Sequence, residues 1–232
     1  MSIQFTDIIN KLPASVPFVG PEAQERSIDQ LFKARIGANE SVFGPSEKAI
    51  STMKKHLSEV WMYGDPENFD LKHALAKKHK VNFENIVVGE GIDGLLGYLV
   101  RLIIKKGDNV VTTDGAYPTF NYHVEGFGGN LHKVPFCNDT EDLQKLLDKV
   151  KETSAKILYV SNPNNPMGTI NKPSDVQTLI QNLPKTTLLC LDEAYIDFVD
   201  DNFVPKISMD TKNVIRMRTF SKAYGMLSLI HI

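Results

Sequence analysis

Apolar residues in this chain gather into short runs that are separated by polar or helix-patterned stretches. The runs lie at residues 85–88, 109–112, 156–160, 187–191 and 213–217. Each is short and continuous, which is typical of a strand buried on both faces of a parallel sheet. Segments with the apolar spacing of a helix lie at residues 94–105, 141–152 and 173–181. This alternation predicts an α/β fold with a mainly parallel sheet flanked by helices.

The first 35 residues lack this alternation. They contain Pro13, Pro17, Gly20 and Pro21, and residues of these two types interrupt regular structure. We therefore interpret residues 1–35 as an N-terminal arm that takes no part in the sheet.

The amino-acid composition indicates which kinds of molecule the protein is able to bind. The chain has 232 residues, of which 42% are hydrophobic, and this is enough for one substantial core. The net charge is -2 and no long basic run occurs, so we expect small-molecule partners rather than nucleic acid or a membrane surface. The charged opening segment lacks the apolar core of a signal peptide, which favours a cytoplasmic location. The distant Cys137 and Cys190, and histidines without ligand spacing, predict neither a disulfide nor a metal site.

A glycine-rich loop offers the first candidate chemistry. Gly89, Gly91 and Gly94 fit G-x-G-x-x-G between a strand-like run and a helical segment, as in dinucleotide-binding folds. Asp114 ends the next strand-like run, where such folds place the acid that binds the ribose. One hypothesis is therefore an NAD-dependent oxidoreductase. However, any helix N-terminus can bind a phosphate through its unpaired amides, so the loop alone does not identify the ligand.

The loops that follow the predicted strands are rich in glycine and polar residues. Ligands of open parallel sheets bind beyond the carboxyl ends of the strands, so these loops are the expected site. They lie at residues 89–93, 114–118, 161–169, 192–195 and 219–225.

Three of these loops carry recognisable motifs, which are SNPNNPMGT at 161–169, DEAYIDF at 192–198 and TFSKAYG at 219–225. They resemble the signature loops of fold-type I pyridoxal-phosphate aminotransferases of the histidinol-phosphate aminotransferase group. The stretches GANESVFGPS at 37–46 and WMYGDPENFDLKHALAKK at 61–78 are similar to that group's N-terminal motifs. The resemblance implies a large domain at residues 36–226 that binds pyridoxal 5'-phosphate, with residues 36–60 beginning a linker or small-domain region.

The resemblance also implies catalytic roles for Lys222, Asp192 and Tyr195. Lys222 would bind the cofactor aldehyde as a Schiff base, which needs a neutral amine and therefore a lowered pKa. Asp192 would face the pyridine nitrogen and keep it protonated, so that the ring can accept the electron pair released at the substrate Cα. Tyr195 and Asn165 would donate to the phenolic oxygen of the cofactor.

The remaining cofactor contacts are implied in the same way. Tyr117 would stack on the pyridine ring, although a tyrosine of the core is the alternative. The backbone N–H groups that begin at Gly91, with those of Ile92 and Asp93, would hold the phosphate, and Ser221 would add its hydroxyl. The group more often has serine at the position of Ile92.

Tyr63 would reach the cofactor phosphate of a neighbouring subunit, which implies a homodimer whose active sites are shared. Gly64 follows it, where the group usually has proline. The substrates implied are an amino acid and a 2-oxo acid.

The leading hypothesis is an aminotransferase that acts on histidinol phosphate or an aromatic-type amino acid. A decarboxylase of the same fold is the alternative, because the two differ mainly in how they hold the substrate. The oxidoreductase hypothesis leaves Asn165, Asp192, Tyr195 and Lys222 unexplained. An inactive fragment is the last alternative.

The segment LSLIHI at 227–232 departs from the family pattern, since Ile230 stands where the family has a phosphate-binding arginine. The six residues match the in-frame translation of a transposon end used to prepare sequencing libraries. We therefore expect a non-native tail and a missing C-terminal small domain, and we assign catalysis to the intact protein.

Overall fold

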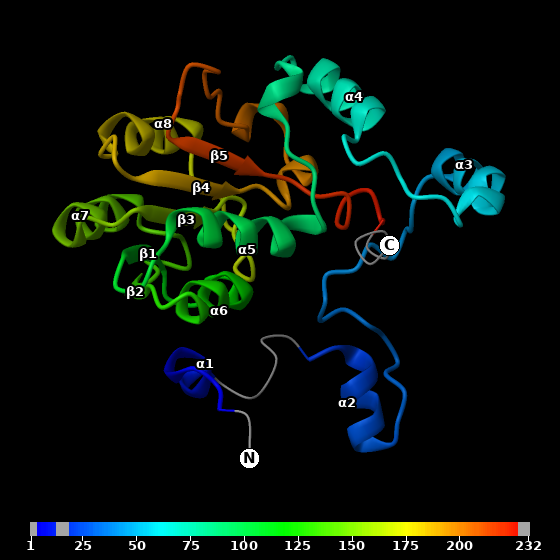
Figure 1. Cartoon of the computed structure of the whole chain (residues 1–232), viewed down its shortest axis with the longest axis horizontal. Helices are drawn as coiled ribbons and strands as arrows, with labels where there is room; N and C mark the ends of the chain where they lie inside the picture. The colour runs from blue at the N-terminus through cyan, green and yellow to red at the C-terminus, as the bar shows by residue number, and fades with distance from the viewer. Residues whose placement is uncertain (1–3, 13–18, 227–232) are drawn as a thin grey trace.

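The computed structural model describes residues 4–12 and 19–226. The expected tail at 227–232 lies outside the described residues, as do Pro13 and Pro17 of the arm. Figure 1 shows a central sheet with helices packed on both sides. Its strands are all parallel and run in the order β2-β1-β3-β4-β5. They are β1 (Asn109–Thr113), β2 (Asn130–Val134), β3 (Ile157–Ser161), β4 (Leu188–Asp192) and β5 (Val214–Met217).

Among the described residues, five α-helices precede β1, and α6, α7 and α8 lie in the connections between β1 and β4. The α-helices are α1 (Asp7–Lys11), α2 (Pro21–Ile28), α3 (Glu47–His56), α4 (Phe69–His79), α5 (Gly91–Ile103), α6 (Pro118–Gly126), α7 (Leu143–Thr153) and α8 (Pro173–Asn182). The 3-10 turns are η1 (Leu57–Glu59), η2 (Phe83–Asn85), η3 (Ile196–Phe198) and η4 (Asp201–Phe203). The predicted fold class is therefore confirmed, although the pattern had not indicated α1, α2, α3 or α6.

Alternate residues of β3 face two different cores. Leu158 and Val160 pack with α7 and α8, whereas Ile157 and Tyr159 pack with α5 and α6. Burial on both faces explains why the strand reads as a continuous apolar run. Each such side chain contributes about 1.5–3 kcal/mol through its removal from water.

Helix α7 shows how the sequence specifies one of the covering helices. Leu143, Leu146, Leu147 and Val150 follow helical spacing and all are buried. Asp142 caps the helix, since its Oδ1 accepts a hydrogen bond from the N–H of Lys145 at 3.0 Å. The buried stripe and the cap together place α7 against the sheet.

The prediction of a strand at 85–88 is wrong. The turn η2 ends at Asn85, Ile86 is extended, and residues 86–88 belong to no strand. The side chain of Val87 is 77% exposed. A strand needs a neighbour for its backbone hydrogen bonds, and no described segment pairs with this run.

Among the described residues before 36, none belongs to a strand of the sheet, and they include α1 and α2. Helix α1 contacts α6, whereas α2 and α3 lie away from the sheet in Figure 1. Glu25 of α2 accepts hydrogen bonds from Arg35 at 2.6 Å and from the N–H of Phe32 at 2.9 Å. These hydrogen bonds hold the segment that follows α2 against the helix. Within the two described ranges, no helix combines the length and apolar character needed to cross a bilayer.

Candidate functional site

The candidate site lies where the parallel strands end. The loops after β1, β3, β4 and β5 carry Tyr117, Asn165, Tyr195 and Lys222 respectively. Strands that run in the same direction bring their carboxyl ends to one edge of the sheet. The structure therefore gathers residues that are up to about a hundred positions apart in the sequence.

Lys222 lies half-buried in the loop after β5. Its Nζ is 5.9 Å from the centroid of the Tyr195 ring and donates to the carbonyl of Ala38 at 3.4 Å. Burial lowers the pKa of the Lys222 amine, while the charges of Asp93, Glu40 and Asp192 oppose that shift. A lowered pKa increases the fraction of neutral amine, which is the nucleophilic form.

Asp192 ends β4 and is almost completely buried. Its Oδ2 accepts a hydrogen bond from the hydroxyl of Tyr159 at 2.6 Å, and its Oδ1 accepts one from the N–H of Ala194 at 3.0 Å. Burial raises the pKa of Asp192 to about 6, and the two hydrogen bonds limit that rise. At neutral pH the side chain is therefore mostly a buried anion. Sequence reasoning missed Tyr159, which reads only as one more apolar residue of a strand.

Asn39 joins two of the predicted residues. Its Nδ2 donates to the hydroxyl oxygen of Tyr195 at 2.9 Å and lies 3.5 Å from Oδ1 of Asn165. Asn39 has a positive φ of 54°, a backbone region that asparagine tolerates better than most residues. Burial raises the pKa of Tyr195, so its hydroxyl keeps its proton at neutral pH. Sequence reasoning noted the stretch that contains Asn39 but assigned it no role.

Tyr117 and Asp93 form a second pair at the site. The hydroxyl of Tyr117 donates to Oδ2 of Asp93 at 3.1 Å. Burial, followed by the nearby Asp93 carboxylate, raises the pKa of Tyr117 to about 12, so the phenol remains a donor. The ring is only partly buried and packs against the core from its edge. The ring is thus half-buried beside the core, and its stacking on a cofactor stays a prediction.

The N-terminus of α5 provides the anion-binding part of the site. Gly91 begins the helix with a positive φ of 69°, which glycine adopts without strain. No side chain caps the helix at Glu90, and the N–H groups of Ile92 and Asp93 lie in its first turn. Such a terminus attracts phosphate through its dipole and its unpaired amides.

Ser221 lies buried in the same loop as Lys222. Its Oγ is 2.8 Å from Oγ1 of Thr219, and its N–H donates to the same oxygen at 3.1 Å. These bonds fix the turn that presents the lysine. A free lone pair or proton of the Ser221 hydroxyl remains for a further partner.

The segment around residues 38–45 packs against the lysine loop. Gly225 has a positive φ of 64°, and a Cβ built there would lie 2.5 Å from the carbonyl carbon of Gly44. The two backbones therefore approach more closely than any residue with a side chain allows. In the same segment, Ala38 accepts a hydrogen bond from Lys222 and Asn39 donates one to Tyr195.

Tyr63 is not brought into this cluster. Its side chain is fully exposed, and within the described residues no hydrogen bond links it to the other site residues. The contact expected with a neighbouring subunit stays a prediction.

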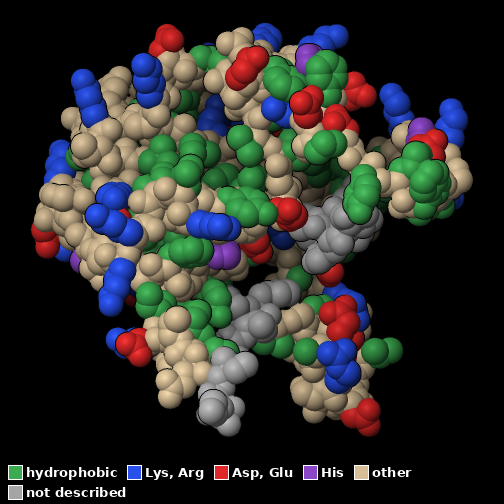
Figure 2. All heavy atoms as spheres, viewed as in Figure 1, with side chains coloured by type: hydrophobic (Ala, Val, Ile, Leu, Met, Phe, Trp, Pro, Cys, Tyr) green, Lys and Arg blue, Asp and Glu red, His purple; other side chains and the backbone are tan. Residues whose placement is uncertain are grey.

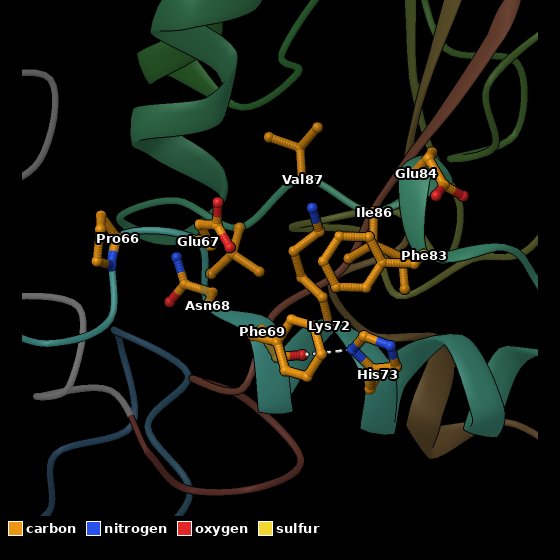
Figure 3. Close-up of a pocket in the computed structure, with 11 residues that line it drawn as sticks. Pro66, Glu67, Asn68, Phe69, Lys72, His73, Phe83, Glu84, Ile86 and Val87 are labelled. Atoms are coloured by element: carbon orange, nitrogen blue, oxygen red, sulfur yellow. Dashed lines mark hydrogen bonds between the residues drawn. The ribbon is translucent and has the colours of Figure 1, made fainter.

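A pocket of about 580 Å³ lies elsewhere, between α4 and residues 83–88. Figure 3 shows Phe69, Lys72 and His73 of α4 facing Phe83 and Ile86 across it. Nζ of Lys72 is 3.9 Å from the centroid of the Phe83 ring. The pocket shares no residue with the predicted site, so it lies outside the chemistry that the motifs indicate.

The structure also weakens the oxidoreductase hypothesis. A dinucleotide fingerprint joins two strands of one sheet, with the glycines between the first strand and its helix. Residues 86–88, which precede Gly89, belong to no strand of the described sheet. The glycine loop therefore opens a helix without the strand that a dinucleotide site requires.

Comparison with known proteins agrees with the motifs. The chain matches the family Aminotransferase class I and II over residues 33–229. It is 32% identical to histidinol-phosphate aminotransferase of Moorella thermoacetica over 218 residues, which cover 92% of this chain and 56% of that protein. It is 29% identical to histidinol-phosphate aminotransferase 2 of Bacillus thuringiensis subsp. konkukian over 229 residues, covering 97% and 62%.

A solved structure is also similar over nearly the whole chain. It is the crystal structure of histidinol-phosphate aminotransferase from Sinorhizobium meliloti in complex with pyridoxal-5'-phosphate. The identity is 49% and the TM-score is 0.92, with 97% of this chain and 61% of that chain covered. The present chain thus spans less than two thirds of the length of these relatives. From this match and the parallel sheet with flanking helices, the chain belongs to the class I and II aminotransferase family.

Proposed function

We propose that the protein is a pyridoxal-phosphate-dependent aminotransferase. It would transfer an amino group between an amino donor, either histidinol phosphate or an aromatic-type amino acid, and a 2-oxo acid. The observation that carries the proposal is a half-buried lysine with a lowered pKa in the same site as a buried, mostly ionised aspartate. The family match favours amino transfer over the decarboxylase and oxidoreductase alternatives.

The residues present fit the cofactor group by group. The first turn of α5 and Ser221 offer N–H and O–H donors to a phosphate, and Asp192 offers an anion to a protonated ring nitrogen. Tyr195 and Asn165 offer polar groups to a phenolic oxygen, and Tyr117 would offer its half-buried ring for stacking. The residues that would hold the cofactor are Gly91, Ile92, Asp93, Tyr117, Asn165, Asp192, Tyr195, Ser221 and Lys222. When bound, the cofactor supplies a ring that accepts electron density from the substrate Cα.

The proton chemistry would fall to Lys222. Its Nζ is neutral more often than that of a solvated lysine, so it can take the proton from the substrate Cα. Asp192 would remain anionic where it meets the ring nitrogen, since its pKa of about 6 lies below neutral pH. Tyr195 keeps its proton and can donate it to a developing negative charge.

The first test is an absorbance spectrum of the chain with added pyridoxal phosphate. We expect a visible band of covalently bound cofactor in the wild type and its loss in Lys222→Ala. Lys72→Ala is the matched control, because Lys72 lies in the pocket beside α4 and should keep the band. A band that persists in Lys222→Ala would contradict the assignment. Histidinol phosphate and aromatic amino acids, added separately, should then bleach the band to different extents.

We further propose that the active protein is a homodimer to which each subunit contributes Tyr63. Support comes from apolar side chains on the surface before α4, where Phe43 is 95% exposed and Trp61 is 81% exposed. Figure 2 shows apolar side chains at the surface where α3 lies in Figure 1. Exposed apolar surface of this kind often marks a protein interface.

The only tryptophan of the chain can report on this association. We expect the fluorescence of Trp61 to shift to shorter wavelength as the protein concentration rises, because an interface would remove the indole from water. Analytical ultracentrifugation should show a dimer over the same range. Emission that does not change while the protein remains monomeric would contradict the proposal.

The domain division is also proposed. Residues 1–35 would act as an arm and residues 36–226 as the cofactor-binding large domain, with 36–60 as its linker. Limited proteolysis should cut before residue 36 while keeping β1 to β5 in one fragment. A first cut within the sheet would contradict this division.

We also propose a cytoplasmic location, where thiols stay reduced. Cys137 and Cys190 are free, the former exposed and the latter buried. Thiol labelling in intact cells should find Cys137 reactive, whereas an oxidised Cys137 would argue against this location.

A further inference from the structure

Tyr159 is a buried polar residue to which the proposed chemistry assigns no role. It lies on β3 and is completely buried, yet its hydroxyl donates to Oδ2 of Asp192 at 2.6 Å. The register pairs Ser161 with Asp192 and Tyr159 with Cys190, so Tyr159 lies diagonally across from Asp192 on the same face. A phenol spans that diagonal, whereas a shorter side chain would not.

Packing holds the Tyr159 ring in this position. Phe120 of α6 stacks on it with ring centroids 4.5 Å apart and an interplanar angle of 16°. Leu96 and Val100 of α5 belong to the same buried cluster. Because the ring is confined on this side, the hydroxyl has little freedom to turn away from the carboxylate.

Most of the surroundings of Asp192 disfavour its ionised form, so the hydrogen bond from Tyr159 matters for keeping the carboxylate charged. Burial and the charges of Asp93 and Glu193 all favour the neutral carboxyl form. Tyr159 and the N–H of Ala194 oppose them, with one donor for each carboxylate oxygen. The Tyr159 phenol itself does not ionise near neutral pH, because burial and Asp192 raise its pKa well above the ordinary value. It is therefore a permanent donor.

We propose that Tyr159 is a positioning residue that orients the Asp192 carboxylate, keeps it anionic and so determines how firmly the ring nitrogen of the cofactor is held protonated. This inference rests on the proposed function, since Asp192 faces that nitrogen only if pyridoxal phosphate binds as described. The effect of Tyr159 on Asp192 itself can be measured without the cofactor.

The first experiment follows the Asp192 carboxyl in the cofactor-free chain. Aspartate carboxyl carbons are labelled with ¹³C, and the Asp192 signal is assigned through its loss in Asp192→Asn. We expect Tyr159→Phe to raise the ionisation midpoint of Asp192 by about one pH unit, because one hydrogen bond to the charged form is lost. Tyr98→Phe is the matched control, since it removes an exposed hydroxyl that contacts Glu90. An unchanged midpoint in Tyr159→Phe overturns the inference.

A second substitution guards against misfolding of Tyr159→Phe. Replacement of Tyr159 by 3-fluorotyrosine keeps the shape of the ring but makes the hydroxyl a stronger donor. We expect the midpoint of Asp192 to fall rather than rise. A midpoint that stays the same or rises in this variant contradicts the role of the hydrogen bond.

The second experiment measures the cofactor end of the interaction. Pyridoxal phosphate labelled with ¹⁵N in its ring is bound to each variant, and the ¹⁵N signal reports the protonation of that nitrogen. We expect the nitrogen in Tyr159→Phe to lose its proton at lower pH than in the wild type. Tyr98→Phe, whose hydroxyl contacts Glu90 rather than a group around Asp192, should leave the signal at its wild-type position.

The outcomes separate the two proposals. A ¹⁵N titration that is the same in Tyr159→Phe and the wild type overturns the inference, even if the carboxyl midpoint moves. A wild-type chain that binds no cofactor overturns the proposed function instead, and the carboxyl titration then still decides whether Tyr159 controls Asp192.

Discussion

The sheet with its covering helices and the segment at residues 19–63 differ sharply in how they treat apolar side chains. In the sheet, Leu158, Val110 and Leu189 are fully removed from water. In the segment, the one described side chain classed as buried is Glu25, a carboxylate. The segment leaves apolar side chains exposed, among them Val19, Ile28, Leu31, Ile36, Val42, Phe43, Leu57, Val60, Trp61 and Met62.

The difference has a geometric origin. Helices α5 to α8 cover both faces of the sheet, so each apolar face has a partner within the chain. Helices α2 and α3 lie away from the sheet in Figure 1, and among the described residues they contribute no side chain to either core cluster. The sheet therefore has a buried core on both faces, whereas the segment before α4 exposes apolar surface of the kind often found at interfaces.

The candidate site lies where these two regions meet. Asn39 of the segment contacts Tyr195, and Ala38 accepts a hydrogen bond from Lys222. Stability thus comes from one region, while the site depends on both. Substitutions in each region can test whether the two regions differ in this way.

The largest expected effect is in the core. Leu158→Ala should lower the free energy of unfolding by about 2–5 kcal/mol, because it removes buried methyl groups between β3, α7 and α8. Leu57→Ala is the control, since Leu57 is 61% exposed and its loss should cost less than about 0.5 kcal/mol. Urea denaturation measures both. Equal losses of unfolding free energy in the two variants would contradict the difference between a buried core and an exposed segment.

The buried carboxylates of the two regions should respond to pH in opposite directions. Burial raises the pKa of Glu141 to about 8, and its Oε1 accepts a hydrogen bond from Asn164 at 2.9 Å. The protonated form of Glu141 is therefore favoured by folding. This contribution to stability is fully present below the pKa of glutamate in the unfolded chain, and it is lost as the pH rises through about 8. Glu141→Gln should therefore gain roughly 1–3 kcal/mol relative to the wild type at high pH.

Glu25 provides the contrast for Glu141. Hydrogen bonds from Arg35 and the N–H of Phe32 lower its pKa, so its contribution is present above the unfolded pKa and is lost as the pH falls. Glu25→Gln should therefore destabilise the chain at neutral pH but not in acid. Urea midpoints across the pH range measure both variants. A stability difference that does not change with pH would refute the assignment for that variant.

The third effect is at the contact between the regions. Gly225→Ala should cost about 1–3 kcal/mol, because a Cβ there meets the backbone of Gly44 and the φ is positive. Gly107→Ala is matched to it, since Gly107 has a φ of 87° but no atom within 4 Å of a built Cβ. The control should lose about 1 kcal/mol from backbone strain alone.

The same two glycine variants can also be compared in their affinity for pyridoxal phosphate. Gly225→Ala should weaken the binding of pyridoxal phosphate, because the lysine loop must move, whereas Gly107→Ala should not. An absorbance titration measures the affinity. Equal affinity in the two variants would mean that the contact of Gly225 with Gly44 does not position Lys222.

The smallest expected effect is on the exposed segment. Phe43→Ser should change the free energy of unfolding of the monomer by less than about 0.5 kcal/mol. It should nevertheless weaken self-association, which sedimentation measures, if Phe43 lies in a dimer interface. A large loss of monomer stability would show that the segment has a core that the exposed side chains do not reveal.

Much of the fold was predictable because the signals are local. The runs at 109–112 and 156–160 are strands, since continuous apolar residues between polar loops fit a sheet buried on both faces. The run at 85–88 has the same pattern and is not a strand, because pairing depends on a neighbour that local sequence does not specify. Helix α6 was missed because its apolar spacing over residues 118–126 is weak, with Phe120 and Val124 as its buried residues.

The amino-acid sequence by itself determined which segments are apolar, where the polar loops fall and that Lys222, Asp192 and Asn165 belong to one set of motifs. Only the tertiary structure decided that Asn39 meets Tyr195 and that the hydroxyl of Tyr159 meets Asp192. The physical reason is that apolar periodicity depends only on residues that are close in sequence. A hydrogen bond between distant residues forms only after strand register and packing have brought its two atoms together.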